Sequence, residues 1–131
     1  MGEDFKLPED LLYDDEHSWV RVEEGGVVSV GLIEPAVKKV DEFVFIKLPE
    51  RGTRIKKGEV YVSLEAMKWS GHIPSPVSGE IIEVNEVLFD EPSRINRDPY
   101  GSWIMKVRLE NEQELKTLHT AEEKRRMLEK G

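Results

Sequence analysis

Lys68 has the most distinctive chemical setting in the sequence. It follows a predicted strand that ends at Glu65 and precedes extended chain that resumes by Ile73, which indicates the tip of a β-hairpin. An exposed lysine is almost wholly protonated at neutral pH and is a poor nucleophile on its own. Another enzyme can acylate it, because an amide removes the charge and leaves a long flexible tether. The hairpin alone leaves two interpretations open, an attachment point and an ordinary surface lysine.

The other residues that commonly carry chemistry form no recognisable constellation. The three histidines, His17, His72 and His119, are far apart and do not share metal-ligand spacing on one element. The sequence contains no Gly-x-Ser-x-Gly nucleophile motif and no glycine-rich phosphate loop. Acidic residues are too numerous for any one pair to be informative. We therefore expect a non-catalytic protein without a metal site.

Length and composition narrow the class of protein further. The chain has 131 residues, a formal net charge of -8 and no cysteine. The charge argues against nucleic-acid binding, and the lack of cysteine excludes disulfides, thiolate metal sites and dithiol chemistry in the polypeptide. No apolar run approaches the roughly 18 residues that span a bilayer, and residues 1–10 lack an apolar signal core. The sequence thus favours a single soluble, cytoplasmic domain with no nucleic-acid or membrane partner.

Short segments of alternating apolar and polar residues predict a mainly β protein from Tyr13 onward. Gly25 and Gly26 lie between two valine-rich segments and predict a hairpin turn. Over residues 60–65 the period of two predicts that Val60, Val62 and Leu64 share the buried face. The expected strands cover 19–22, 27–30, 43–48, 60–65, 80–84 and 103–109, with a short helix over 34–40, a loop with a little helix over 89–100 and a helix over 111–131.

The two ends of the chain are expected to add little to the core. Residues 1–12 are an acidic lead-in with few groups to bury. The apolar stripe of the C-terminal helix is thin, since it consists of Leu115, Leu118 and Leu128. This pattern predicts a helix that packs loosely on the sheet and has a frayed end.

Two pairs of segments are similar to each other. Residues 25–30 match residues 79–84, and residues 61–65 match residues 106–110. Two similar halves of short strands suggest a pseudo-symmetric sandwich or a flattened barrel. The alternative is chance, because alternating valine and isoleucine strands resemble one another.

Six stretches of the chain are informative when they are taken together. They are residues 16–20 (EHSWV), 30–36 (VGLIEPA), 43–52 (FVFIKLPERG), 65–68 (EAMK), 75–85 (SPVSGEIIEVN) and 96–104 (NRDPYGSWI). In this order and spacing the chain resembles the H protein of the glycine cleavage system, a lipoyl-carrying member of the biotinyl/lipoyl domain families, or an H-like lipoate-binding paralogue. The resemblance runs from about Leu12 to the final helix and so covers nearly the whole chain.

The resemblance implies the fold and its divisions. The family fold is a flattened β-barrel sandwich hybrid of two pseudo-symmetric sheets, with a short internal helix and a C-terminal helix. We therefore expect one lipoyl-carrier domain over residues 1–131. Within it, residues 1–12 are the lead-in, residues 13–110 the β-barrel sandwich and residues 111–131 the C-terminal helix.

The resemblance also implies a cofactor and its partners. The family's modified lysine falls on Lys68, Glu65 falls on the family's acidic position, and Gly79 falls where the family's chain leaves the hairpin. Lipoate, covalently amide-linked to Lys68, would form a swinging arm in glycine catabolism and one-carbon metabolism. The arm would accept an aminomethyl group from the pyridoxal-phosphate glycine decarboxylase and present it to the aminomethyltransferase. A dihydrolipoyl dehydrogenase would reoxidise it, and a lipoate ligase or lipoyl transferase would attach it. The protein itself would be a carrier, since the cofactor supplies the sulfur chemistry.

Two positions depart from the family's usual residues. Ser18 stands where the family usually has a glutamate thought to meet the amine of the cargo, and a hydroxyl offers only a neutral hydrogen bond. Glu16 is one substitute; otherwise the arm carries sulfur, as in heterodisulfide-reductase-like sulfur oxidation. Ala66 and Met67 match the pattern of biotin carriers, which keeps biotin open as the cofactor. A further hypothesis is a non-carrier lipoyl donor or docking protein in which Lys68 stays free.

Trp69 directly follows the candidate lysine and is unusually large for an exposed turn. Three roles are open to it: packing across the hairpin, shielding the dithiolane of the arm, or forming part of a surface on which a partner docks. The sequence is consistent with all three.

Overall fold

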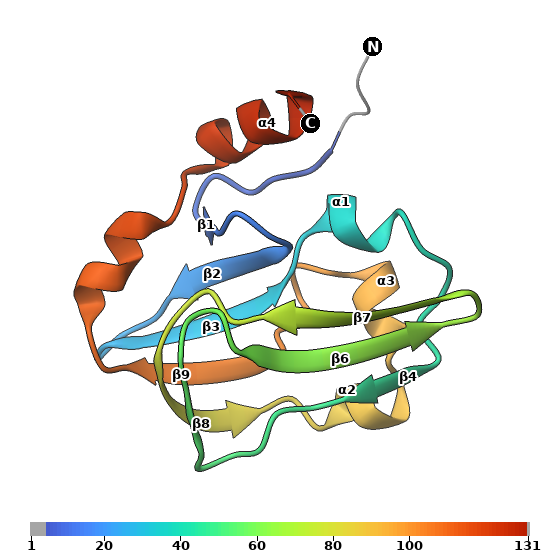
Figure 1. Cartoon of the computed structure of the whole chain (residues 1–131), viewed down its shortest axis with the longest axis horizontal. Coiled ribbons are helices and arrows are strands. Elements are labelled where there is room, and N and C mark those ends of the chain that lie inside the picture. The colour runs from blue at the N-terminus through green and yellow to red at the C-terminus, as the bar shows by residue number, and fades with distance from the viewer. Residues whose placement is uncertain (1–4, 131) are drawn as a thin grey trace.

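Two β-sheets form the framework of the computed structural model, which describes residues 5–130 (Figure 1). The larger sheet has the strand order β1-β2-β3-β9-β8-β5 and the smaller one the order β4-β6-β7. The predicted class is confirmed, because the protein is mainly β with short internal helices and a C-terminal helix. The strands are β1 Leu12–Tyr13, β2 Ser18–Val22, β3 Val27–Leu32, β4 Phe45–Lys47, β5 Arg54–Ile55, β6 Val60–Ala66, β7 Trp69–Pro74, β8 Gly79–Val84 and β9 Met105–Leu109. The helices are α1 Glu34–Val37, α2 Val87–Asp90, α3 Arg94–Arg97, the 3-10 helix η1 Glu112–Thr117 and α4 Ala121–Lys130.

The sheets are unequal, with six and three strands, and the strand pairing over residues 5–130 does not join them into a closed barrel. The similar segments 25–30 and 79–84 lie largely in β3 and β8, which pair with opposite sides of β9. The other similar segments lie in different sheets, one in β6 and one in β9. None of the described helices is long and apolar enough to cross a bilayer.

The first hairpin forms where the sequence predicts it. β2 and β3 are antiparallel, and Gly25 and Gly26 both have positive φ, 71° and 75°. Glycine adopts this conformation without the steric cost that a Cβ would impose. The turn is closed by a hydrogen bond from the Glu23 amide to the Val27 carbonyl, 2.8 Å long.

The main core lies between the two sheets. In β6 the buried residues differ from those that the sequence predicts. Val60 was predicted to face inward, yet it is 53% exposed, whereas Tyr61 and Val62 are both buried. The reason is an irregularity in the pairing of β6 with β7 between Val60 and Val62. Such a bulge lets two consecutive residues point into the core, which alternation alone does not predict.

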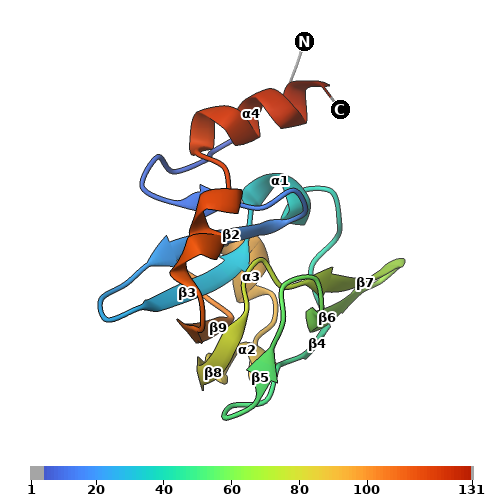
Figure 2. The same cartoon turned by 60° about the vertical axis from the view of Figure 1, so that its left-hand side comes forward.

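A second apolar cluster joins β1 and β2 to the segment before β1 and to α4. Figure 2 shows α4 on the side of β1 and β2 that faces away from the small sheet. Leu7 and Leu11 are buried there against Tyr13, Trp19 and α4. The expectation that residues 1–12 have little to bury is therefore wrong over its described part; residues 1–4 lie outside the described residues. Two leucines suffice to attach this segment, because each buried side chain contributes about 1.5 to 3 kcal/mol.

The predicted helix over 111–131 is interrupted, and only α4 is an α-helix. His119 exchanges backbone hydrogen bonds with Tyr13, of 2.7 and 2.9 Å, and this strand-like pairing is incompatible with a continuous helix. Thr120 then caps α4, because its hydroxyl accepts from the Glu123 amide while the Glu123 carboxylate accepts from the Thr120 amide. Gly131 lies outside the described residues.

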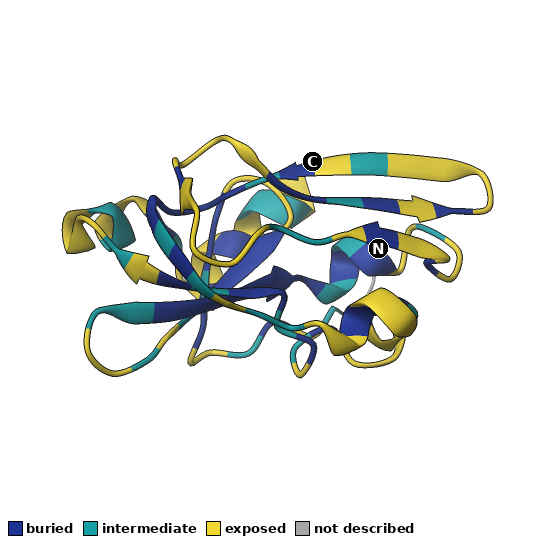
Figure 3. Ribbon diagram, turned by 90° about the horizontal axis from the view of Figure 1, so that it is seen from below, coloured by how far each residue is buried: buried dark blue, intermediate teal, exposed yellow. Residues whose placement is uncertain are grey.

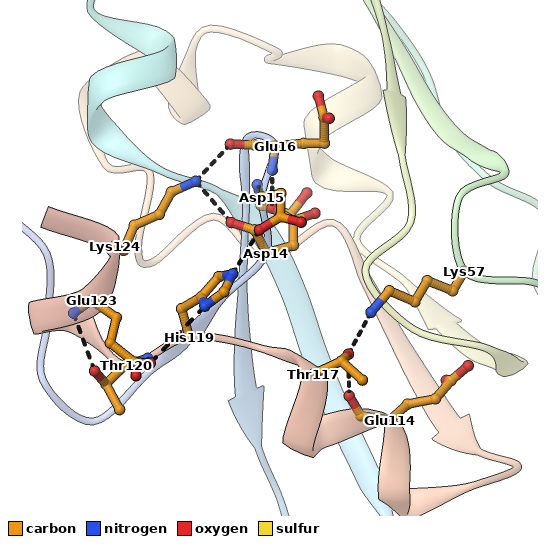
Figure 4. A network of polar contacts seen from close by, with 11 residues as sticks. Asp14, Asp15, Glu16, Lys57, Glu114, Thr117, His119, Thr120, Glu123 and Lys124 are labelled. Atoms are coloured by element: carbon orange, nitrogen blue, oxygen red, sulfur yellow. Dashed lines mark hydrogen bonds and ion pairs between the residues drawn. The ribbon is translucent and has the colours of Figure 1, made fainter. Parts of the chain in front are cut away.

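A buried lysine holds helix α4 in place (Figure 4). The sequence predicts loose packing for this helix, and that prediction is wrong. Lys124 is 2% exposed, and its Nζ donates to the backbone oxygens of Asp14 and Glu16 at 2.7 and 2.9 Å. Burial lowers the pKa of Lys124. These bonds fix the connection between β1 and β2 to the C-terminal helix.

Three elements are shorter than the sequence predicts, and before β4 and β9 a side chain bonds a backbone group that the predicted strand would have included. The amide of Phe43 donates to the Asn96 side chain at 2.9 Å, and β4 begins only at Phe45. The carbonyl of Trp103 accepts from the Asn85 side chain at 2.9 Å, and β9 begins at Met105. The expected helix over 34–40 is reduced to α1, Glu34–Val37.

Alkaline pH is expected to unfold the protein as its three tyrosines ionise. Burial raises the pKa of Tyr100 to about 12, and it raises the pKa of Tyr13 and of Tyr61 further. The stability that these groups contribute is fully present below their ordinary value of 10.0 and is lost as the pH rises through the folded values. In a titration followed by tyrosinate absorbance and circular dichroism, tyrosinate should form only as the folded signal disappears.

The control for this titration is the chain in guanidinium, where the tyrosines should ionise near their ordinary pKa of 10.0. Lys124 titrates in the opposite sense, because its lowered pKa increases the stability as the pH rises toward 10.5. The effect of this one lysine on stability is opposed by the effect of the three tyrosines. Tyrosinate formation near pH 10 with an intact circular dichroism spectrum would contradict the burial of these hydroxyl groups.

Candidate functional site

Lys68 lies in the turn of the β6–β7 hairpin, which extends to one end of the molecule (Figures 1 and 3). Ala66 pairs with Trp69, so only Met67 and Lys68 connect the strands. No non-glycine residue from 5 to 130 has a positive φ, so this tight turn avoids the left-handed backbone that many two-residue hairpins need. Lys68 is exposed, and its side chain makes no hydrogen bond or ion pair with any described residue. The structure therefore places a free ammonium group at the tip of a paired hairpin.

Trp69 packs along its own strand. Its indole lies over Gly71, where a Cβ would overlap the ring, and it contacts Phe43 with ring centroids 6.0 Å apart and planes tilted by 45°. Packing is thus one observed role of Trp69, both along β7 and toward the segment before β4, which lies on the other side of β6, while 38% of the residue stays exposed. Glycine at position 71 makes this arrangement sterically feasible.

A small apolar pocket lies beneath Trp69 and Phe43. Its volume is about 90 Å³, and its walls come from the hairpin, α1, the segment after α1 and the side chain of His17. Pockets that bury drug-sized ligands are roughly 300 to 1,000 Å³. With Trp69 in this position, the pocket is too small to enclose such a ligand.

Ser18 is completely buried, and its hydroxyl is already engaged. Its Oγ lies 2.8 Å from the hydroxyl oxygen of Tyr61, and its amide donates to the Asp14 carboxylate at 3.1 Å. Burial raises the pKa of Asp14 and of Tyr61. The position that departs from the family's usual residue therefore contributes an internal hydrogen bond and presents no group to the surface.

The three histidines lie in three separate places, as their spacing predicts. His17 borders the apolar pocket, and His72 lies on the outer side of the hairpin with its Nδ1 2.8 Å from the Ser63 hydroxyl. His119 lies near α4, where its Nε2 is 2.6 Å from the Asp15 carboxylate. The hydrogen bond from His119 lowers the pKa of Asp15.

The sequence does not single out the residues that position this region. Phe43 supports Trp69, Tyr61 bonds Ser18, and Lys124 holds the loop that carries Glu16, whose side chain points away from this network (Figure 4). Each of these contacts joins residues far apart in the chain, so no local pattern signals them. The burial of Lys124 in particular runs against expectation from sequence, because lysine is almost never fully buried unless its charge is paired.

Comparisons with known proteins give consistent results. The sequence model of the family described as "Glycine cleavage H-protein" matches residues 11–131. A protein named "Probable glycine cleavage system H protein" from Pyrococcus abyssi is 47% identical over 123 residues, which are 93% of this chain and 91% of that protein. A "Glycine cleavage system H protein" from Coprothermobacter proteolyticus is 45% identical over 119 residues, 90% of this chain and 94% of that protein. The crystal structure of a glycine cleavage system H protein from Mycobacterium marinum superposes with a TM-score of 0.79 at 34% identity, covering 89% of this chain and 94% of that one.

The hydrogen bond between Ser18 and Tyr61 is expected to stabilise the fold. Tyr61→Phe leaves the buried Ser18 hydroxyl without its partner and should lower the free energy of unfolding by about 1 to 3 kcal/mol. Ser18→Ala should act similarly, and the double variant should lose less than the sum of the two. Ser63→Ala, which removes a hydroxyl from a more exposed pair, should change stability by no more than about 0.5 kcal/mol. Strict additivity in denaturant melts would show that the two hydroxyls are not coupled.

Gly71→Ala is expected to move the Trp69 indole off its strand, because the new Cβ occupies the position of the ring. The fluorescence emission should then shift to longer wavelength as the indole becomes more exposed. The same change in a Trp69→Phe background is the control, since the two remaining tryptophans, Trp19 and Trp103, belong to a different cluster and should not respond. An unchanged emission maximum would contradict the close approach of the indole to Gly71.

Proposed function

The chain belongs to the glycine cleavage H-protein family, and we propose that it is a lipoyl carrier whose arm is attached to Lys68. The arm would move an aminomethyl group between the enzymes of the glycine cleavage system. The observation that supports this most directly is the exposed, unpaired Lys68 side chain at the two-residue turn of the β6–β7 hairpin.

The residues around Lys68 fit a lipoyl group attached by an amide. Lys68 and its neighbour in the turn, Met67, are both exposed, so the point of attachment is accessible. Strand β6, which leads to Lys68, pairs with β4 on one side and with β7 on the other. This pairing keeps the point of attachment fixed while the arm moves. The lipoyl group supplies a dithiolane that is opened and closed by thiol-disulfide chemistry. With no cysteine in the chain, that chemistry has no competing protein thiol.

The proposed partners follow from the family. They are the pyridoxal-phosphate glycine decarboxylase, the aminomethyltransferase, the dihydrolipoyl dehydrogenase and the lipoate ligase or lipoyl transferase that loads Lys68. We propose that the chain is a cytoplasmic, single-domain carrier over residues 1–131 and is not itself a catalyst. The position of Lys68 supports this role, since an exposed turn residue is accessible to an enzyme that acylates it.

A second candidate function is favoured by the burial of Ser18. Its hydroxyl bonds Tyr61 inside the protein, so the position contributes no carboxylate to an amine cargo. An H-like carrier of sulfur, of the kind used in heterodisulfide-reductase-like oxidation, needs no such carboxylate. Glu16 is the exposed carboxylate nearest in sequence on the same loop and is the alternative acceptor for an amine.

Incubation with a lipoate ligase, lipoate and ATP should add one lipoyl group to Lys68, detected by intact mass and peptide mapping. Lys68→Arg should abolish the adduct, whereas Lys39→Arg, an exposed lysine on the segment after α1, should not. Lys68→Ala should change the free energy of unfolding by no more than about 0.5 kcal/mol, because a free turn residue contributes little to stability. Absence of the adduct on a folded chain would reject the lipoyl carrier, and the same assay with a biotin ligase would then test biotin.

The cargo is tested with the lipoylated chain in its oxidised, disulfide form, mixed with glycine and the decarboxylase; the carbon-sulfur bond to the aminomethyl group forms as the disulfide opens, and the second sulfur becomes a thiol. An aminomethyl adduct on the arm, lost on Glu16→Gln but retained on Asp10→Asn, would favour glycine cleavage with Glu16 as the acceptor. A lipoylated chain that is never loaded would favour the sulfur carrier. If a function in cells survives Lys68→Arg, the chain is a docking protein.

A further inference from the structure

Beside the hairpin tip lies a surface of exposed apolar residues that we call the tip patch: Val44, Phe45 and Met67. We propose that the tip patch is the surface on which the enzyme that acylates Lys68 docks, and that this enzyme presents an apolar surface flanked by lysine or arginine. The inference rests on the proposed function, because it assumes that Lys68 is acylated.

The three side chains of the tip patch are unusually exposed for their type. Val44 is 59% exposed, Phe45 is 45% exposed and Met67 is 77% exposed. Phe45 stands opposite Glu65 in the pairing of β4 with β6, and Met67 follows Glu65 by two residues. Diagonal neighbours of this kind lie within reach of long side chains. The apolar surface therefore adjoins the turn that carries Lys68.

The backbone that carries the tip patch is fixed at several points. The Asn96 side chain accepts from the Phe43 amide at 2.9 Å and donates to the Asp41 carbonyl at 3.3 Å. The Val44 amide donates to the Glu65 carbonyl at 2.8 Å. Phe43 itself is buried against Trp69. A segment held this firmly loses little conformational entropy when a partner covers it, which favours binding.

The charges around the tip patch are mainly negative. Asp41, Glu42 and Glu65 are all exposed, and none of them takes part in an ion pair among residues 5–130. Lys47 is the exposed cation on the same strand as Phe45. Lys68 itself adds a second ammonium before it is acylated, so the balance is three carboxylates against two ammonium groups. This excess of negative charge favours a partner with basic residues around its apolar contact, since complementary charge speeds encounter and suppresses wrong partners.

The short reach of unmodified lysine selects the acylating enzyme among the partners. Before loading, the reactive Nζ is separated from the backbone by a four-carbon stem only. An enzyme that must bring Nζ to an activated acyl group therefore contacts the residues beside the turn. Enzymes that act on the far end of a loaded arm have no such requirement.

The acylation step is the one that docking should accelerate. Nζ, after losing a proton, attacks the acyl carbon of lipoyl adenylate; the carbon-nitrogen bond forms as the carbon-oxygen bond to AMP breaks, AMP leaves with the electron pair, and the nitrogen releases a second proton to solvent to give the amide. The adenylate comes from lipoate and ATP, with pyrophosphate released. No oxidant or reductant is involved.

The test is the rate of lipoylation by a lipoate ligase that modifies the wild-type chain. The variant Val44→Ser with Phe45→Ser should raise the KM for the carrier at least about tenfold and leave kcat nearly unchanged, because it weakens docking but keeps Lys68. The matched control is Val87→Ser with Phe89→Ser, which removes a valine 50% exposed and a phenylalanine 62% exposed from α2. Melting temperatures of both variants should stay close to that of the wild type.

Reversing the negative charges beside the tip patch tests the same proposal independently. Asp41→Lys with Glu42→Lys should raise KM, and this effect should diminish at high salt. The control Glu86→Lys with Asp90→Lys makes the same change in net charge on exposed positions at α2 and should leave KM unaltered.

Each outcome is decisive. Unchanged KM in the Val44/Phe45 variant, or an equal rise in the α2 control, would overturn the tip patch as the docking surface while the carrier function stands. A wild-type chain that no lipoate ligase modifies would reject the carrier function itself. A wild-type dimer that the Val44/Phe45 variant converts to a monomer would assign the patch to self-association and overturn the proposal.

Discussion

The hydrogen bond between Ser18 and Tyr61 joins the two sheets inside the core, and the smaller of these sheets contains the hairpin that carries Lys68. Ser18 begins β2 in the large sheet, and Tyr61 lies in β6 of the small sheet. Strand pairing does not connect the two sheets over the described residues, so contacts through the core must align them. A buried hydrogen bond makes this packing directional. If the sheets shifted, both hydroxyl groups would be buried without a partner, which costs free energy, whereas apolar contacts tolerate such a shift.

The same buried pair is connected to the end of the chain. The Asp14 carboxylate accepts from the Ser18 amide, while Lys124 on α4 holds the backbone oxygens of Asp14 and Glu16. Helix α4 therefore does more than cover the outer cluster, since it fixes the loop in front of β2. This arrangement also gives the serine at position 18 a structural role in this chain, distinct from the surface role that the family resemblance implies for a glutamate there.

One short segment serves both the support of the hairpin and the surface beside it. Residues 41–45 turn Phe43 inward against Trp69 and turn Val44 and Phe45 outward. Asn96 anchors the segment from α3, so both faces are rigid. Rigidity on both sides suits a carrier: the cofactor arm supplies the movement, and the protein supplies a defined point of departure and a defined surface around it.

The sequence by itself determined the β class, the first hairpin with its two glycines, and the turn position of Lys68, because these depend on periods and turn residues that are local in the chain. Local patterns failed where distant groups competed. The Tyr13–His119 backbone pairing divided the expected C-terminal helix, the bulge turned Tyr61 inward in place of Val60, and Lys124 became a buried donor. Only the tertiary structure decided these points, as well as the burial of Ser18. Each depends on a residue far away in the chain. When folding buries a polar group, that group needs a hydrogen-bond partner, and here the distant residue provides it.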